Sequence, residues 1–562
     1  MATGDLLVRG GTVVDGTGIR PFAADVRVRG GRIVEVAAGL AAVDGETTFD
    51  ATGAYVTPGF LETHTHYDPA MFWDPSFDPM PQHGVTTVTF GNCGLSLAPI
   101  RTADVGRVSD VFCYIEDMSV ATFATAIPWS WETYGEYLDA IAEKSFAVNT
   151  SGLIGHSVIR QYVIGNEAWD RPSTPEETVQ IVAVLEAALD AGAYGLSTSL
   201  GFDTDRDKRL VPSRVADDAE FRALFEVLAR RKRIVQFIPS PIPKYLVRDV
   251  QRMADVSRGL DLVQTWINVY YNARRPEEAV GYLEMAARLQ AEGIRSIPQV
   301  SPRGFDMEVN WFGGMSFYTM DDTWHRVLQA DADGKRELLT DPQWRARARE
   351  QWDATPFTMI QHRHPQNIVF TSLAPQNAAW EGRTFAEMIE ERGEHPSDVL
   401  ADLLLENDLA PGIVARDVAN GDPDGVSELL RHPAGVLSNS DAGAHVQMMC
   451  AEGDTTLLLT RHVRDRGDIS IEEAIHRMTG HQASIFGYHD RGTIEVGKAG
   501  DLVVFALDEL SYAAPVSISD LPDGGRRQRR PAGGYRATFV GGVATQVDGE
   551  LTGALPGRLL RP

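Results

Sequence analysis

The alternation of hydrophobic and polar residues changes along the chain, and these changes mark its organisation. Residues 25–36 alternate apolar and polar positions, which predicts a pair of half-buried strands. Residues 501–505 form an apolar strand-like run, and residues 536–545 predict another hairpin. We therefore predict a small β-sandwich formed by both termini, residues 1–57 plus 490–562; two unrelated β appendages are the alternative.

Between the termini, strand-like and helix-like segments alternate. Residues 174–192 predict a helix that opens with a capping threonine and a proline, and strand-like runs follow at residues 194–199 and 234–238. This repetition across residues 58–489 predicts a TIM-type (β/α)8 barrel, with chemistry at the C-terminal ends of its strands. Residues 103–141 interrupt the alternation, and we expect them to form an insertion that acts as a lid.

The strongest local signal is a pair of histidines, His64 and His66, at the end of the apolar run that begins at Pro58. Side chains two residues apart on a strand leave it on the same face. Neutral imidazole is a good ligand for Zn²⁺, so this pair supplies half of a small coordination shell. The alternative is two surface histidines after a strand.

Three further residues carry candidate chemistry. Asp441 follows the apolar run 434–440, and a carboxylate there is able both to bind a metal and to accept a proton; the alternative is an ordinary turn residue. Cys93 follows the strand-like run 85–90, where its thiolate would bind Zn²⁺ unless it is a small buried hydrophobe. His156 is positioned to orient a substrate, with a core histidine as the alternative.

Together these motifs resemble the amidohydrolase superfamily and, within it, the D-aminoacylase (N-acyl-D-amino-acid deacylase) branch. The resemblance covers nearly the whole chain, and its motifs lie in the family's order at residues 6–18, 58–66, 84–94, 440–441 and 491–505. It implies a distorted barrel with a two-part β-sandwich. It also implies hydrolysis by water that a bound metal activates.

The resemblance also implies roles for individual residues. His64 and His66 correspond to metal ligands, and Asp441 to a ligand that is also the general base. Cys93 stands where that branch has a metal-binding cysteine, and His156 corresponds to a segment that lines the family's active site, where we expect a catalytic role.

The chain departs from the branch in the middle of the barrel. The branch has a metal-binding histidine on each of two mid-barrel strands, but residues 234–238 and 262–268 contain none. We therefore expect one Zn²⁺ ion and doubt a second site; His156 or His445 would complete the shell. The branch's substrate-binding lysine is also missing. Arg160 and Arg303 are the candidates to bind a substrate carboxylate in its place, with His445 as a further substrate contact.

Composition narrows the class of partners and the compartment. The formal net charge of −26 at pH 7 argues against a nucleic-acid or an anionic-membrane partner. The start of the sequence lacks a secretory signal, and no run approaches the ~18 apolar residues of a membrane-spanning helix. Three scattered cysteines are too few for a disulfide framework, so we expect a cytoplasmic protein with a small-molecule substrate. Its oligomeric state, including a homo-oligomer, stays open.

The leading hypothesis is therefore a metal-dependent hydrolase of an amide C–N bond. We expect an N-acyl amino acid or a related amide with a hydrophobic arm, which the aromatic residues Trp129, Trp131, Tyr270 and Tyr271 would contact unless they are ordinary core residues. The alternatives are a cyclic-amide hydrolase, a deaminase or a decarboxylase of the same superfamily, or a non-catalytic relative that only binds a ligand.

Overall fold

Eight parallel strands form one curled sheet at the centre of the computed structural model, which describes residues 4–267, 269–438 and 440–562. The order of the strands is β18-β14-β13-β12-β11-β10-β9-β8. Their bounds are β8 (Phe60–Glu62), β9 (Val85–Phe90), β10 (Asn149–Gly155), β11 (Gly195–Ser199), β12 (Ile234–Ile238), β13 (Val263–Trp266), β14 (Arg295–Val300) and β18 (Val436–Leu437). Asn268 and Asn439, which belong to two of the predicted runs, lie outside the described residues.

The two edge strands of this sheet meet just beyond their C-terminal ends. Thr65, after β8, forms a parallel bridge with Ala442, after β18. The amide of His66 donates to the carbonyl oxygen of Ala442 at 2.8 Å, and the amide of Asp441 donates to that of His64 at 3.2 Å. The barrel therefore closes at the segments that carry the predicted metal ligands, and the predicted TIM-type fold is confirmed.

Helices cover the outside of the barrel, as the alternating pattern predicts. The predicted helix 174–192 forms α5 (Pro175–Ala191), where Thr174 and Glu177 make a capping box and Gly192 ends the helix with φ of 116°. Outside the two insertions, the helices that follow the barrel strands are α4 (His156–Ile164), α6 (Asp218–Arg230), α7 (Pro243–Ser257), α8 (Pro276–Ala291), α14 (Pro423–Arg431), α15 (Asp454–Leu457), α16 (Ile471–Met478) and α17 (Gly480–Phe486). No helix among the described residues is long and apolar enough to cross a membrane.

A β-sandwich contains strands from both ends of the chain, as predicted. One sheet has the order β5-β4-β1-β6 and the other β24-β23-β22-β19-β7-β2-β3. These strands are β1 (Leu6–Arg9), β2 (Thr12–Val13), β3 (Phe22–Ala23), β4 (Asp25–Arg29), β5 (Arg32–Ala37), β6 (Thr47–Asp50), β7 (Tyr55–Pro58), β19 (Leu502–Phe505), β22 (Ala537–Val540), β23 (Val543–Val547) and β24 (Glu550–Leu551).

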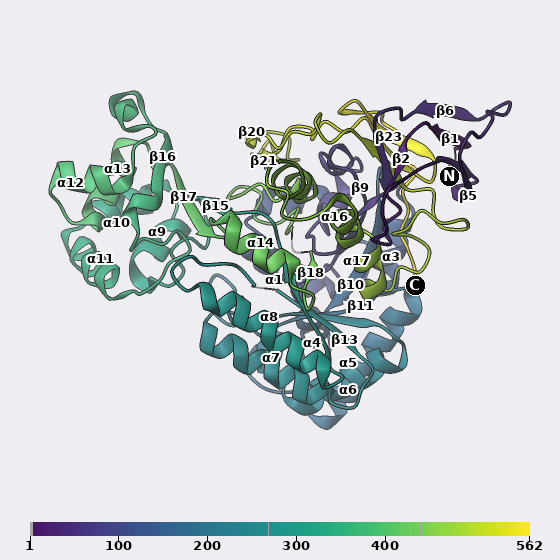
Figure 1. Cartoon of the computed structure of the whole chain (residues 1–562). Coiled ribbons are helices and arrows are strands. Elements are labelled where there is room, and N and C mark those ends of the chain that lie inside the picture. The colour runs from purple at the N-terminus through teal and green to yellow at the C-terminus, as the bar shows by residue number, and fades with distance from the viewer. Residues whose placement is uncertain (1–3, 268, 439) are drawn as a thin grey trace.

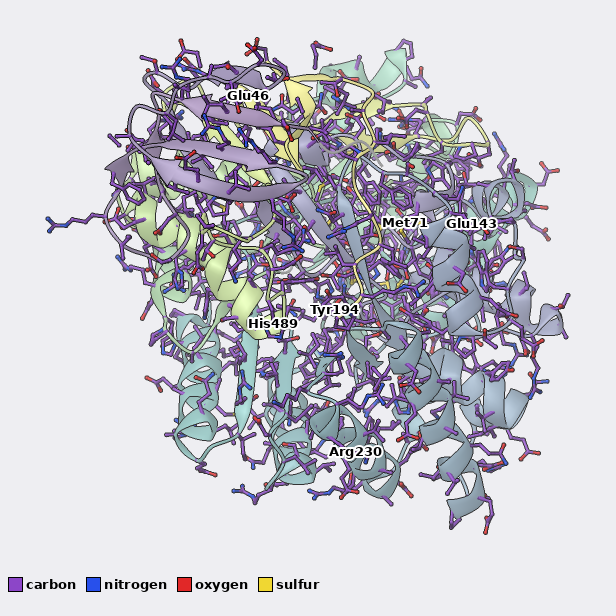
Figure 2. The ribbon with its side chains drawn as sticks, turned by 90° about the vertical axis from the view of Figure 1, so that its right-hand side faces the viewer. Glu46, Met71, Glu143, Tyr194, Arg230 and His489 are labelled. Atoms are coloured by element: carbon purple, nitrogen blue, oxygen red, sulfur yellow. The ribbon has the colours of Figure 1, made fainter. Side chains whose placement is uncertain are left out.

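The join between the two ends is a direct strand pair. β7 pairs with β19 in antiparallel register, with Val56 opposite Val504. Val8 and Val26 of the four-stranded sheet pack with these strands in one apolar core. Figure 1 shows the sandwich at the upper right, and Figure 2 shows Glu46 beside it, at the end of the molecule opposite Arg230 of the barrel helices.

A second insertion, residues 305–420, was not predicted. It contains a sheet of order β15-β17-β16 and a separate apolar core that includes Trp324, Trp344 and Trp352. Figure 1 shows its helices at the left, away from the sandwich. Its elements are β15 (Phe305–Glu308), α9 (Arg326–Gln329), α10 (Ala332–Thr340), α11 (Pro342–Ala354), β16 (Ile368–Ser372), α12 (Phe385–Arg392), α13 (Pro396–Glu406) and β17 (Gly412–Ala419). Its helices have the same amphipathic texture as barrel helices, so the sequence pattern does not separate them.

The predicted lid segment, residues 103–141, is helical and well packed. It contains α1 (Val105–Ile115) and α2 (Val120–Ala126), and α3 (Tyr134–Ala142) runs to its end. Trp131 is buried and contacts the rings of Phe72 and Tyr137, with centroids 5.1 and 4.9 Å away. This tryptophan is therefore part of the core, and the lid role stays a prediction.

A short antiparallel hairpin near the C-terminus consists of β20 (Val516–Ile518) and β21 (Arg527–Arg529).

Candidate metal centre

Four candidate ligands converge at the carboxyl edge of the barrel. His64 and His66 follow β8, Cys93 follows β9, and Asp441 follows β18. The Nε2 atom of His64 lies 3.2 Å from the Cys93 Sγ and 3.5 Å from the Asp441 Oδ1. The Nε2 atom of His66 lies 3.3 Å from the same Asp441 oxygen.

These separations fit a small tetrahedral shell. Ligands at about 2.0–2.3 Å from a zinc ion are roughly 3.3–3.7 Å apart along the edges of a tetrahedron. The ligand atoms of His64, His66 and Cys93 all lie within 4.8 Å of one another, and all three side chains are buried. The donor set of two imidazoles, a thiol and a carboxylate therefore suits Zn²⁺.

Two residues that carry no sequence motif hold the imidazole rings. The His64 Nδ1 lies 2.8 Å from the Gln299 Oε1 on β14, and the His66 Nδ1 lies 3.2 Å from the Glu116 Oε1 after α1. The Gln299 Oε1 accepts from the His64 Nδ1, which leaves the lone pair of the His64 Nε2 for a metal. The Glu116 carboxylate forms an ion pair with His66 without a hydrogen bond to its Nδ1. Sequence reasoning missed both residues, since Glu116 comes from the predicted lid and Gln299 has no neighbouring motif.

The protonation preferences of the ligands match a cation site. Burial lowers the pKa of His64 to about 4, so its imidazole is neutral. Burial also opposes a charge on His66, but Glu116 and Asp441 outweigh it and raise the pKa of His66 to about 9. Burial raises the pKa of the Cys93 thiol. A cation at these atoms therefore displaces protons from His66 and Cys93.

Backbone strain gathers at the same place. Cys93, Asp441 and His445 all have positive φ, at 61°, 64° and 48°. This region is sparsely populated by residues other than glycine, and such residues cluster at functional sites. Gly443, with φ of 85°, passes so close to the His66 backbone that a Cβ atom would lie 3.0 Å from it. The loop after β18 is thus shaped to bring Asp441 against the histidine pair.

The mid-barrel side of Cys93 is apolar. Cys93, Ile238 and Ile267 form a small buried cluster, so isoleucines stand at the ends of the two strands that lack the branch's histidines. Gln236 accepts a hydrogen bond from the Cys93 amide at 2.8 Å through its Oε1. A hydrocarbon wall cannot bind a cation, so the described residues offer one ligand cluster rather than two.

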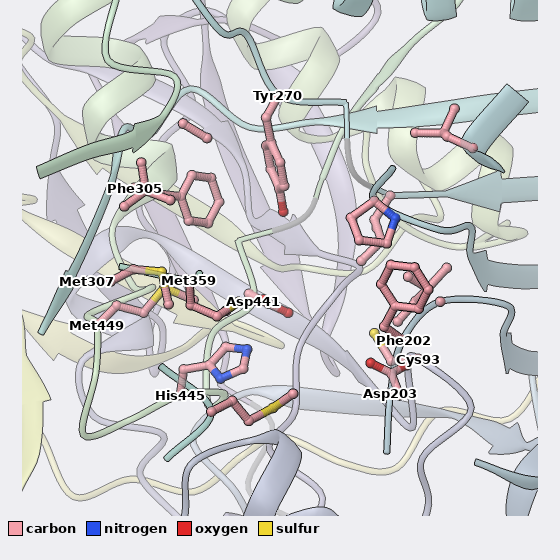
Figure 3. A pocket seen from close by; sticks show the side chains of 18 of the residues that line it. Cys93, Phe202, Asp203, Tyr270, Phe305, Met307, Met359, Asp441, His445 and Met449 are labelled. Carbon is pink, nitrogen blue, oxygen red and sulfur yellow. The ribbon is translucent and has the colours of Figure 1, made fainter. Parts of the chain in front are cut away.

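A cavity of about 350 Å³ opens onto this centre. Figure 3 shows Asp441 and His445 at its wall, with Phe305, Met307, Met359 and Met449 on one side and Phe202 and Asp203 on another. Tyr270 and Tyr271, which we predicted beside the substrate, line the cavity, whereas Trp129 and Trp131 do not. Its acidic, guanidinium and imidazole side chains are His66, Glu116, Asp203, Arg275, Glu278, Asp441 and His445.

The predicted roles of His156 and Arg160 require correction. The His156 Nε2 lies 2.7 Å from the Glu220 Oε1, its Nδ1 lies 3.0 Å from the Thr198 hydroxyl, and Arg160 pairs with the same glutamate. All three side chains are fully buried, and neither His156 nor Arg160 lines the cavity. Burial lowers the pKa of His156, so its neutral imidazole serves as a hydrogen-bond partner of Glu220, and Glu220 balances the charge of Arg160. This position argues against both catalysis by His156 and substrate binding by Arg160.

Arg303 also forms its contacts within the protein and not with the cavity. Its Nε donates to the Asp454 Oδ1 at 3.0 Å, and its Nη2 donates to the backbone oxygen of Ser440 at 2.6 Å. It is buried and does not line the cavity, so it supports the loop before Asp441 instead of meeting a substrate carboxylate. His445 does line the cavity, and its amide donates to the backbone oxygen of Glu116 at 2.6 Å. Its predicted contact with substrate therefore stays a prediction.

The fold and the site define a metal-dependent hydrolase on a TIM-type barrel. The model of the amidohydrolase family matches residues 47–238 and 354–546, and the chain belongs to this family. A protein of Mycobacterium tuberculosis is 30% identical over 98% of this chain and 93% of its own length. N-acyl-D-aspartate deacylase from Alcaligenes xylosoxydans xylosoxydans is 26% identical over 100% of this chain and 96% of that protein.

Solved structures agree on the fold. A D-aminoacylase superposes with a TM-score of 0.68 at 23% identity, with both chains covered completely. N-acyl-D-glutamate deacylase from Bordetella bronchiseptica, complexed with zinc and a phosphonate inhibitor, has a TM-score of 0.65 at 22% identity, again over both whole chains. The predicted resemblance to the D-aminoacylase branch and the predicted hydrolysis of an amide C–N bond are confirmed.

Proposed function

We propose that this enzyme hydrolyses an N-acyl amino acid or a closely related amide with one Zn²⁺ ion held by His64, His66, Cys93 and Asp441. The observation that carries the proposal is the convergence of their ligand atoms at 3.2–3.5 Å on the cavity. The names of the relatives, which are deacylases of N-acyl amino acids, support the substrate class.

The chain's own residues divide the work of hydrolysis. A bound divalent ion supplies Lewis acidity, which activates water and polarises the scissile carbonyl. Asp441 accepts a proton from the attacking water through its carboxylate and returns it to the leaving amine. Glu116 and Gln299 keep the two imidazoles oriented. The apolar side chains of the cavity exclude competing water and take up a hydrophobic arm.

The apolar cluster of Cys93, Ile238 and Ile267 supports a single ion. The solved D-aminoacylase is described as having a binuclear metal centre in which one metal activates and the second attenuates. In this chain Ile238 and Ile267 lie beside Cys93 where the mid-barrel strands end, and the Gln236 Oε1 is taken up by the Cys93 amide. We therefore propose activation by one metal without attenuation by a second.

Arg275, whose guanidinium group lines the cavity, is a better candidate to bind a substrate carboxylate than the buried Arg160 and Arg303. Arg275 precedes α8, lines the cavity and is about half exposed. Its partner Glu278, 3.0 Å away, is also partly exposed, so the pair is free to open. We propose that Arg275 binds the carboxylate of an N-acyl amino acid in place of the branch's lysine.

Metal analysis of matched variants tests this proposal. Purified protein should contain one Zn²⁺ per chain and cleave N-acyl amino acids; the double variant His64→Ala and His66→Ala should lose both properties. His489→Ala, at an exposed histidine away from the cavity, is the control and should keep both. A double variant that retains its zinc and its turnover would overturn the proposed centre.

A further inference from the structure

Asp203 is a carboxylate of the cavity wall that the proposed reaction does not use. It lies four residues after the end of β11, and Figure 3 shows it near Cys93 and Phe202, on the other side of the view from Met449. Asp203 lines the same cavity as His66, Cys93 and Asp441, so a substrate bound in this cavity is able to reach both the metal centre and Asp203.

Asp203 differs from the other three carboxylates that line the cavity. Glu116 and Asp441 face His66 at 3.2 and 3.3 Å, and Glu278 faces Arg275 at 3.0 Å. Asp203 accepts one hydrogen bond, from the Ser199 hydroxyl. Among the described residues, no lysine, arginine or histidine forms an ion pair with it.

An unmatched carboxylate in a desolvated wall is costly, and its environment suits a cation. Burial raises the pKa of the Asp203 carboxyl, and the Ser199 hydroxyl and the charge of His66 offset this rise only in part. A cationic group of a ligand would complete the pairing that a buried carboxylate normally has. Burial raises the pKa of Tyr318 to about 12, and the Asp203 charge adds to this rise, so the two groups are near each other. Phe202, Tyr270 and Tyr318 line the same cavity, and aromatic faces attract ammonium groups.

We propose that the substrate amide carries a protonated amine and that Asp203 binds this ammonium group. The proposal rests on the proposed amide hydrolysis and names its substrate class. An N-acyl amino acid with a basic side chain satisfies both charged groups, because its carboxylate meets Arg275 and its ammonium meets Asp203. The excess of acid over base in the whole chain, a net charge of −26, favours the approach of such a cationic end.

Three N-acetyl amino acids of similar length separate the charge of the side chain from its size. The N-acetyl derivatives of lysine, norleucine and glutamate, each as both enantiomers, are compared by kcat/KM with zinc-loaded protein. We expect lysine to exceed norleucine by about 10- to 100-fold, the range of a charged hydrogen bond in a partly buried site, and glutamate to be slowest. Pentylammonium should compete with the lysine derivative, and added salt should weaken it.

Asp203→Asn is the decisive variant because it keeps the shape and removes the charge. It should reduce the preference for lysine over norleucine to about twofold or less and weaken pentylammonium binding, with turnover of the norleucine derivative within about threefold and unchanged zinc content. Asp207→Asn, at an exposed carboxylate of the same loop, is the matched control and should leave the preference intact.

Three results would overturn the inference. The first is equal cleavage of the lysine and norleucine derivatives by the wild type, and the second is an unchanged preference in Asp203→Asn. The third is loss of zinc from Asp203→Asn, which would make Asp203 a metal ligand. All three leave amide hydrolysis standing. Failure of zinc-loaded wild type to cleave any amide would refute the proposed function instead, and pentylammonium binding would then decide the role of Asp203 separately.

Discussion

Removal of the Glu116 carboxylate should weaken metal binding without removing a ligand. In the wild type the Glu116 Oε1 lies 3.2 Å from the Nδ1 of His66, inside a site where both side chains are buried. Glu116→Ala removes the carboxylate that pairs with the His66 ring and frees the ring to rotate. Loss of such a supporting partner costs about 10- to 100-fold in metal affinity, or roughly 1.4–2.7 kcal/mol.

The geometry places the expected value near the lower end of this range. The contact at 3.2 Å is an ion pair without a hydrogen bond, so we expect about tenfold for Glu116→Ala. Glu116→Gln keeps the size of the side chain beside the ring and should lose less. The assay is competition for Zn²⁺ with a chromophoric chelator, with Glu143→Ala at an exposed glutamate as control (Figure 2). A zinc Kd for Glu116→Ala within twofold of wild type would refute the orienting role.

Three further predictions concern catalysis, recognition and the fold. Asp441→Asn should keep most of the zinc while kcat falls by about 10²- to 10⁴-fold, measured by elemental analysis and single-turnover kinetics, because an amide does not accept the proton; near-normal turnover would place the base elsewhere. Arg275→Ala should raise KM for N-acyl amino acids and leave it unchanged for their carboxamides; equal effects on both would remove Arg275 from carboxylate binding. Arg491→Ala should lower the free energy of unfolding by about 3–5 kcal/mol in denaturant titration, since it breaks the buried pair with Asp501 at 2.6 Å; a loss below about 1 kcal/mol would contradict this.

The parts of the site that sequence predicts are those that local pattern encodes. His64 and His66 lie two residues apart directly after β8, so the end of one strand places both at the same barrel edge. Asp441 follows a strand that has to end at the same barrel edge. The same local logic predicts α5, whose cap and proline are adjacent in sequence. The position and the role of a residue are therefore predictable where its partners lie only a few residues away in the sequence.

The parts that sequence misses depend on distant partners. Gln299 and His64 form a hydrogen bond although they lie 235 residues apart in the sequence, and no motif near either residue indicates this contact. Arg160 and Arg303 resemble free cations in the sequence, but Glu220 and Asp454 neutralise them in the interior. The insertion 305–420 is similarly hidden, because its amphipathic helices match those of a barrel.

The central claim is one activating metal, and titration of the metal-free enzyme tests it most directly. Zn²⁺ is added to chelator-treated protein in steps, and hydrolysis of an N-acyl amino acid is followed with the bound metal. Because Ile238 and Ile267 close the second side of Cys93, we predict that turnover rises to a plateau at one equivalent and stays there with excess zinc. A second tightly bound equivalent that changes the rate, or no turnover at any zinc content, would contradict the account.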